Sequence, residues 1–331
     1  LPNKFFRTDY GIGLRGYLSK ANAVDCIVDF GSEQVFEATT YTCLLFLSRT
    51  PRATFELASS EASAAALQKV IFKSRPSESL GETSWTFADE RESSLHKKVW
   101  AVSQRLLDLP ADMSRGSSSG DDETFVVEAD SHGLEPKALR TPLFASDFGR
   151  YFLEPSTQWQ IIFPYAIGDG GARLMSSAEF QRLAPKAFAH LQNNGARLRE
   201  RKQFKEWFGY SAPRNLELHE RAQIAVPLLA NKPTFAFIHQ NQRGTLCPMA
   251  SGGFTVSLDS RCPLKPEFVL GLLNSKLLFW FLRQASNVFR GGWITCTKQY
   301  FGELPIVKLD LSSPSSRALH DKLVALVDKM L

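Results

Sequence analysis

The sequence has few cysteines, and none lies in a metal-binding arrangement. Its 331 residues include five cysteines, but neither a C-x-x-C pair nor an H-E-x-x-H motif occurs. A disulfide-stapled domain or a zinc finger is therefore not indicated. We expect buried thiols in a reducing compartment, and the cysteines stand at positions 26, 43, 247, 262 and 296.

Long apolar runs and a strong excess of one charge are also missing. The longest apolar run, residues 268–282, is interrupted by Asn274, Ser275 and Lys276, so it is too short to span a bilayer. The first residues lack the apolar core and cleavage site of a signal peptide. We expect a soluble, cytoplasmic fragment of a longer chain. The 39 basic and 34 acidic residues give a net charge of +5, so a polyanionic partner would need a local basic surface.

The pattern of apolar residues predicts an α/β protein with about two domains. Residues 24–30 and 40–47 have the composition of buried strands, joined by a hairpin-like connection. A Gly/Ser-rich stretch, SRGSSSGDD at residues 114–122, is compatible with a linker. Helical spacing is expected over residues 10–20, 59–70, 95–109, 177–205, 266–285 and 315–331.

Three short motifs imitate catalytic signatures, and none has the required context. Residues 11–16 fit G-x-G-x-x-G, but the preceding segment is too polar for the buried strand of a dinucleotide site. Asp29-Phe30-Gly31 matches a kinase triplet without the other kinase motifs. Ser118 in G-x-S-x-G lacks the strand and helix of a hydrolase elbow. The sequence therefore names no catalytic residue and no metal ligand in this chain.

Several segments nevertheless follow one another in the order typical of DNA adenine-N6 methyltransferases. LPNKFFRTDYGIGLRGYLSK at residues 1–20 resembles the strand end, Y-G-x-x-L-R segment and helix of that family. IVDFGSEQVFEATTYTCLLFL at residues 27–47 resembles its I-x-D-F-G…V-F hairpin. The later segments resemble the TaqI-like specificity domain that follows the catalytic domain in single-chain restriction–modification enzymes. These segments are residues 116–125, 161–165, 185–201, 272–276 and 304–306. Asp122 and His190 depart from the family pattern, which prefers Asn and often has Tyr at these positions.

The resemblance implies the C-terminal end of a Rossmann-like methyltransferase sheet, followed by a mixed α/β target-recognition domain with a C-terminal helix. The family's glycine motif for S-adenosyl-L-methionine and its [DNS]-P-P-[YF] loop would lie upstream, and no Pro-Pro pair occurs here. We therefore expect this chain alone to bind no cofactor and to be inactive, with the S-adenosyl-L-methionine site in the parent enzyme. The implied divisions are 1–52 (methyltransferase end), 53–110 (helical connector), 111–310 (TaqI-like target-recognition domain) and 311–331 (C-terminal helix).

Two hypotheses of function remain open at this point. The first is the DNA-binding specificity portion of a site-specific DNA adenine-N6 methyltransferase from a restriction–modification enzyme. Its partners would be double-stranded DNA and the remainder of the methyltransferase polypeptide, with or without an endonuclease. The alternative is a protein-interaction module that serves as a scaffold in a phage-defence assembly of methyltransferase-like subunits.

The resemblance and the loop composition suggest where DNA would be contacted. Phe36 matches the hairpin phenylalanine that stacks on a flipped adenine in the family; the alternative is a core position between two strands. The loop after residue 115 can bring backbone and carboxylates to a base edge, or it can be a disordered linker. Its candidate residues are Gly116, Ser119, Gly120 and Asp122.

Basic and aromatic residues supply the remaining candidates. Arg199 and Lys202 belong to a run of five cations between Arg197 and Lys205, which on a helix would form a phosphate-binding stripe or a merely solvated face. The sequence Arg290-Gly291-Gly292-Trp293 is a glycine-opened loop whose arginine can recognise a guanine edge. The other candidates for DNA contact are Trp207, Arg214 and Lys298.

Overall fold

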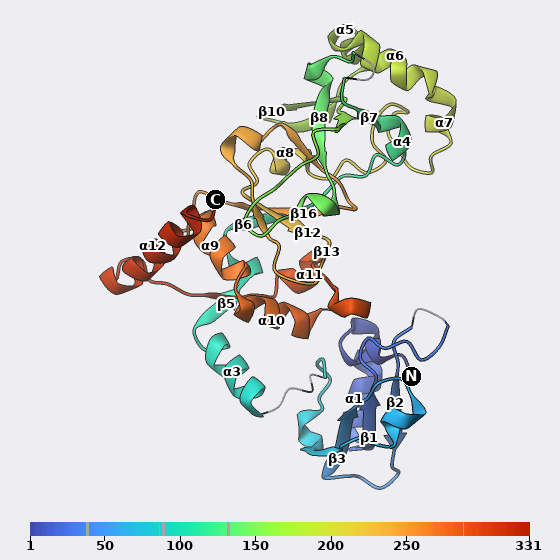
Figure 1. The fold of residues 1–331 in the computed structure, drawn as a ribbon, viewed down its shortest axis with the longest axis vertical. Helices are drawn as coiled ribbons and strands as arrows, with labels where there is room; N and C mark the ends of the chain where they lie inside the picture. Colours follow the sequence, from blue (N-terminus) through green and yellow to red (C-terminus); the bar gives the residue numbers. More distant parts are fainter. Residues whose placement is uncertain (38–39, 86, 88–89, 131–132, 287) are drawn as a thin grey trace. The chain divides into compact units, whose positions relative to one another are not determined.

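The structure, a computed structural model, consists of two units (Figure 1). It describes residues 1–37, 40–85, 87, 90–130, 133–286 and 288–331, without the side chains of Glu90 and Arg290. Unit 1 comprises Leu1–Lys98 and Arg283–Ile294, and unit 2 comprises Val99–Leu282 and Thr295–Leu331. The polypeptide thus returns once to unit 1 before it ends in unit 2. The expected mixed α/β architecture with a C-terminal helix is confirmed.

A four-stranded sheet forms the centre of unit 1. β1 runs antiparallel to β2 and parallel to β3, and β4 returns antiparallel to β3. The strand order is β2-β1-β3-β4. β1 and β2 lie in the two segments that the sequence predicts as buried strands, but only Cys43 of β2 is buried, and Leu44, Phe46 and Leu47 are exposed. The strands are β1 (Val24–Asp29), β2 (Cys43–Leu47), β3 (Thr54–Ser59) and β4 (Lys73–Pro76).

Aromatic packing stabilises the start of unit 1. The rings of Phe5, Phe6 and Trp85 lie within 6.1 Å of one another, centroid to centroid, and all three side chains are buried. They belong to one core cluster with Ile27 and Phe55 from the sheet. Helix α1 (Ile12–Lys20) follows two short 3-10 turns and agrees with the helix expected over residues 10–20.

Two of the expected helices are shorter than the sequence pattern suggests. The segment 59–70 contains only α2 (Ala64–Leu67), because Ser59 still belongs to β3 and the Ser63 hydroxyl caps the helix by accepting from the Ala66 N–H at 3.1 Å. In the segment 95–109, α3 (Glu90–Trp100) ends early and strand β5 (Ser103–Arg105) follows. In these two segments, local hydrogen bonds and strand pairing determine the structure, and the helical spacing of apolar residues does not.

Unit 2 contains two four-stranded sheets and several short pairs of strands. One sheet has the order β14-β12-β16-β6 and the other the order β15-β8-β9-β7. The short pairs include β10 with β11 and β18 with β5. The strands are β6 (Ala111–Arg115), β7 (Val126–Glu128), β8 (Leu139–Leu143), β9 (Trp159–Ile162), β10 (Tyr165–Gly168), β11 (Gly171–Leu174), β12 (Ile224–Pro227), β13 (Leu229–Ala230), β14 (Ala236–Phe237), β15 (Leu246–Pro248), β16 (Gly253–Leu258), β17 (Ile294–Thr295, at the border of the units) and β18 (Pro305–Val307).

Helices pack on these sheets and complete the core of unit 2. Phe125, Ile161 and Phe180 are fully buried in one cluster that joins the second sheet to the helices after it. The C-terminal helix packs on α9, where Gly271 leaves room for the side chains of Val327 and Leu323. The helices are α4 (Asp122–Phe125), α5 (Ser177–Leu183), α6 (Pro185–Asn193), α7 (Gly195–Arg199), α8 (Leu216–His219), α9 (Pro266–Leu273), α10 (Lys276–Ala285), α11 (Lys298–Phe301) and α12 (Pro314–Asp328).

Candidate nucleic-acid interface

The Gly/Ser-rich stretch forms a fixed loop of unit 2, residues 116–121, that leads from β6 into α4. Its backbone is paired on both sides: Ser117 N–H donates to the Pro248 carbonyl at 2.8 Å, and Ser118 exchanges two 3.0 Å hydrogen bonds with Ala212. Gly116 is required at the entry, because a Cβ there would lie 2.4 Å from the Met249 carbonyl. α4 ends on the fully buried Phe125. This loop, named the anchored loop below, is therefore not a disordered linker.

Two arginines hold the backbone of the anchored loop from within unit 2. Arg201 donates to the carbonyl oxygens of Ser119, Leu198 and Trp207, at 2.5, 2.9 and 2.5 Å. Arg214 donates to the Gly116 carbonyl at 3.2 Å. Partial burial lowers the pKa of Arg201 from its ordinary value, but an arginine stays charged in proteins. Charge-assisted hydrogen bonds of this kind fix the backbone more firmly than neutral ones.

A third arginine neutralises the acidic residues beside the loop. Arg197 forms ion pairs with Asp121 at 2.7 Å and with Glu123 at 2.6 Å. Hydrogen bonds to Glu123 and Asp121 raise the pKa of the Arg197 guanidinium. The Asp121 carboxylate also accepts from the Thr124 hydroxyl at 2.9 Å. Both acids are therefore occupied, and Arg197 is not a free cation for a phosphate.

The anchored loop turns at Gly120, and Asp122 follows the loop as the first residue of α4. Gly120 has a φ of +79°, and a Cβ there would lie 1.9 Å from the Ser211 hydroxyl, so only glycine fits. Ser119 is fully buried, and its hydroxyl donates to the carboxylate of the exposed Asp122. The loop and α7 border an open hollow of about 650 Å³. An oriented carboxylate at such a hollow can accept from the amino groups of adenine or cytosine.

The expected helix over residues 177–205 is three short helices, and this changes the basic stripe. Pro185 begins α6, Gly195 begins α7, and α7 ends at Arg199. The five cations therefore do not share one face of a single helix. Arg199 lies over the Trp207 ring at 4.6 Å, while Lys202 and Lys205 are exposed and have no ion pair among the described residues.

Trp207 and Lys298 have different surroundings within unit 2. The Trp207 ring packs against Phe188 and Phe208 at centroid distances of 5.9 and 5.5 Å, so its main contacts are with the core of unit 2. Lys298 begins α11 and is exposed. Of the candidates in unit 2, the structure brings together Gly116, Ser119, Gly120, Asp122 and Arg214 around the anchored loop.

The remaining candidates belong to unit 1. Phe36 lies in the connection between β1 and β2 and is 61% exposed, so the alternative of a core position is wrong. Trp293 is exposed and follows Gly291 and Gly292, whose φ values of +75° and +74° explain why two glycines stand there. The Arg290 backbone begins this turn, and its side chain lies outside the described residues.

The return of residues 283–294 to unit 1 is a feature that sequence reasoning missed. Arg7 donates to the Ser286 carbonyl at 3.2 Å, and Tyr41 meets Phe289 edge to face at 6.2 Å. These contacts involve polar and aromatic residues without a recognisable spacing, so no motif marks them. As a result, the Gly-Gly turn and Phe36 belong to the same unit.

The G-x-G-x-x-G stretch of residues 11–16 does not form a phosphate cradle. A Cβ at Gly11 would lie 2.1 Å from the Phe5 carbonyl oxygen. Arg15 fills the turn instead and donates to the carbonyl oxygens of Phe5 and Thr8. The turn of residues 11–16 therefore has no room for the pyrophosphate that a dinucleotide fingerprint would hold.

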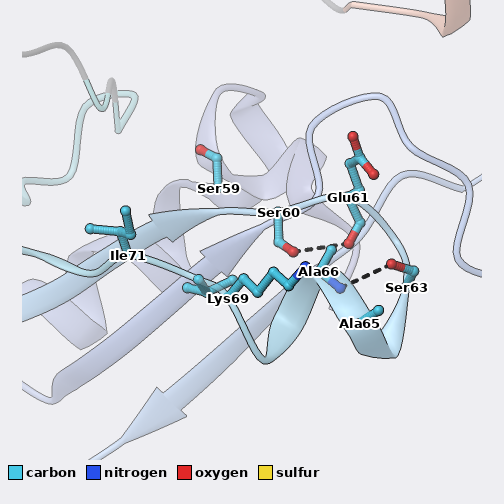
Figure 2. Close-up of a pocket in the computed structure, with 9 residues that line it drawn as sticks. Ser59, Ser60, Glu61, Ser63, Ala65, Ala66, Lys69 and Ile71 are labelled. Atoms are coloured by element: carbon cyan, nitrogen blue, oxygen red, sulfur yellow. Dashed lines mark hydrogen bonds between the residues drawn. The ribbon is translucent and has the colours of Figure 1, made fainter.

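A further open hollow of about 550 Å³ lies at the carboxyl end of β3 (Figure 2). Its serine hydroxyls are used locally: Ser60 donates to the Glu61 carbonyl at 2.9 Å, and Ser63 caps α2 (Figure 2). Lys69 lies along its edge (Figure 2). We assign no chemistry to this hollow.

A curated protein is similar in sequence to almost the whole of this chain. The chain is 23% identical, over 358 aligned positions, to the type II restriction enzyme and methyltransferase RM.Eco57I of Escherichia coli. The alignment covers 97% of this chain and 35% of that protein. The chain resembles restriction–modification enzymes. It spans about a third of the length of this relative. No protein-family model matches.

A solved restriction–modification enzyme shares the fold of this chain. The type IIL restriction–modification enzyme MmeI, solved in complex with DNA, superposes with a TM-score of 0.58 at 11% identity, over 92% of this chain and 38% of that one. The type IIG restriction endonuclease BpuSI gives a TM-score of 0.46 at 13% identity, over 99% of this chain and 41% of that one. Among the described residues, no helix is long and apolar enough to cross a membrane.

Removing the central arginine should loosen the anchored loop. We expect Arg201→Ala to lower the free energy of unfolding by about 2–3 kcal/mol, because three carbonyl oxygens lose a charged donor. Urea denaturation of the purified chain measures this. Arg199→Ala is the matched control and should cost less than about 1 kcal/mol, since it loses one exposed cation–π contact. Equal losses in the two variants would contradict the anchoring role.

The exposed phenylalanine of unit 1 should be dispensable for folding. We expect Phe36→Ala to change the free energy of unfolding by no more than about 0.5 kcal/mol, because the ring is already in water. Phe55→Ala, in the same unit but buried, should cost about 3–5 kcal/mol. Thermal and urea unfolding of both variants test this. A large loss for Phe36→Ala would mean that the ring supports the core.

Proposed function

We propose that this chain is the DNA-binding, sequence-specificity portion of a site-specific DNA adenine-N6 methyltransferase in a restriction–modification enzyme. The observation that carries the proposal is the similarity to RM.Eco57I, which extends over 97% of this chain. The fold shared with MmeI, whose structure contains DNA, also supports a DNA-binding role. The alternative of a protein-interaction module is not favoured by these similarities.

In this proposal unit 2 reads the duplex with the anchored loop. The backbone of the loop is fixed by Arg201 and Arg214, so binding would cost little ordering entropy. Asp122 would accept a hydrogen bond from a base amino group, and Lys202 and Lys205 would contact phosphates nearby. The positions Ser119 and Gly120 would act through the shape of the loop, since one is buried and the other has no side chain.

Unit 1 would contribute to the pocket for the target adenine. An exposed aromatic ring on a loop is suited to stacking on a base that has left the duplex. Phe36 has this position after β1, and Trp293 is a second exposed ring of the same unit. The Gly-Gly turn before Trp293 would let Arg290 approach a groove closely, as the sequence pattern suggests.

The methyl donor would be bound by another part of the enzyme. The glycine turn of residues 11–16 is filled by Arg15 and offers no cofactor cradle. S-adenosyl-L-methionine would supply the methyl group there, while the residues of this chain bind DNA and hold the base.

The sheet of unit 1 offers a surface for that other part. The outer edge of β2 is paired in the described chain only through residues 1–3, and the exposed side chains of Leu44, Phe46 and Leu47 continue along the strand. An apolar edge strand of this kind is normally covered. We propose that the remainder of the methyltransferase polypeptide covers it.

Binding to duplex DNA tests the proposed function directly. We expect the chain to bind a duplex with an affinity that falls as salt rises, because phosphate contacts release counterions. The double variant Lys202→Glu/Lys205→Glu should weaken binding to all sequences and reduce the slope of log K against log salt by about 2, given roughly 0.9 per phosphate contact. Fluorescence anisotropy at several salt concentrations measures both.

The control reverses a charge away from the loop. Lys322→Glu on α12 should leave the affinity and the slope unchanged. Failure of the unmodified chain to bind duplex DNA would refute the proposed function. Unchanged binding by the double variant would refute the phosphate role of these two lysines.

Two substitutions in the full-length enzyme separate base stacking from sequence reading. We expect Phe36→Ala to lower methylation of every target, because the flipped base loses its stacking surface. Arg290→Ala should lower methylation of the preferred target by about 10–100-fold and relax selection at one base pair, as one bidentate contact contributes roughly 1–3 kcal/mol. Methylation profiling over randomised duplexes measures both effects. Equal slowing of all sequences by Arg290→Ala would reassign this residue to phosphate binding.

A further inference from the structure

A pocket of about 620 Å³ lies in unit 1 beside β3, β4 and α3, and none of the candidate DNA-contacting residues lines it. The buried side chains of Phe55, Leu57 and Leu80 form an apolar floor. This volume is within the usual range of small-molecule sites, about 300–1,000 Å³, which combine an apolar wall with a few polar groups.

Three cations line the same pocket. Arg75 lies directly opposite Phe55 in the β3–β4 register and therefore on the same face of the sheet. Lys97 and Lys98 come from the last turn of α3, one turn after Ser93 and Ser94, which also line the pocket. Among the described lining residues there is no acidic side chain, and no described ion pair uses these three charges.

An unpartnered donor belongs to this group. The Nε of Arg75 is buried and has no hydrogen-bond partner in the described structure. Buried polar atoms are almost always hydrogen-bonded, so an orphaned donor in a cationic pocket indicates a missing acceptor. Since a guanidinium donates in a fork that matches a phosphate, an anionic oxygen is the acceptor that suits it best.

We propose that this pocket binds a nucleotide, with the base against the apolar floor and the phosphate among Arg75, Lys97 and Lys98. The apolar floor can pack against the flat face of a base. The serine hydroxyls of α3 can form hydrogen bonds with the sugar or with the edge of the base. The ligand chemistry is a nucleobase joined to a phosphate ester, supplied either by a free mononucleotide or by an unpaired nucleotide of a DNA strand. The proposal does not depend on the DNA-reading role of unit 2.

Calorimetric titration of the full chain with dAMP and with a short single-stranded DNA tests the proposal. We expect saturable binding of at least one of them and a loss of about tenfold or more in affinity for Lys97→Gln/Lys98→Gln, since two charge-assisted contacts disappear. Both lysines are exposed, so the variant should fold. Arg75→Gln, checked by circular dichroism, should lose affinity similarly.

The control and the outcomes separate this site from the anchored loop. Lys69→Gln/Lys322→Gln removes the same charge outside the pocket and should bind like the unmodified chain. Binding of dAMP supports a free nucleotide as the ligand, and binding of single-stranded DNA alone supports a strand. Absence of binding to both, or unchanged affinity in Lys97→Gln/Lys98→Gln, would overturn the site. Lys202→Glu/Lys205→Glu should affect duplex DNA only, so the two proposals fail independently.

Discussion

The anchored loop depends on one partly buried charge, the guanidinium of Arg201. It joins the loop carbonyl of Ser119 to the carbonyls of Leu198 and Trp207, and so ties the loop to its own segment, which lies 82 residues further along the chain. A Gly/Ser-rich stretch has high conformational entropy in the unfolded chain. Without a strong internal donor it would be free to adopt many shapes. With it, the exposed Asp122 is held at a defined place on unit 2.

The same arrangement explains how a mildly basic chain can present a local binding surface. Of the cations between residues 197 and 205, two are engaged within the chain: the exposed Arg197 pairs with acids, and the partly buried Arg201 donates to backbone carbonyls. Lys202 and Lys205 are exposed and have no ion pair among the described residues. The engaged cations shape and neutralise the loop, and the two lysines are available to a polyanion. Net charge alone does not reveal this division.

Sequence patterns predicted much of the fold because strong local signals determine it. The strands β1 and β2, the helix α1 and the C-terminal helix α12 follow from apolar spacing, but β2 exposes most of its side chains and is not the buried strand that its composition suggests. The pattern failed where short elements depend on neighbours. A continuous helix over residues 177–205 would need to pass Pro185, and the structure has three helices instead. The internal use of Arg197 and Arg201 was not predictable either, because an arginine in a polar run carries no sign of its partner.

The candidate residues illustrate the same limit. The exposure of Phe36 agrees with its place in a connection between strands, which the sequence already indicated. The return of residues 283–294 to unit 1 has no periodic signal, since it consists of single contacts such as the one from Arg7 to Ser286. Long-range pairings of this kind become visible only once the fold is known.

Amide hydrogen exchange with and without a DNA duplex tests most directly whether a fixed loop of unit 2 contacts DNA. In the free chain, the amides of Ser118 and Ala212 should exchange slowly, because they are paired with each other's carbonyls. When a duplex is bound, the amides of residues 120–123 should gain protection. Rapid exchange at Ser118 and Ala212 in the free chain, or unchanged exchange at residues 120–123 with DNA bound, would contradict the account.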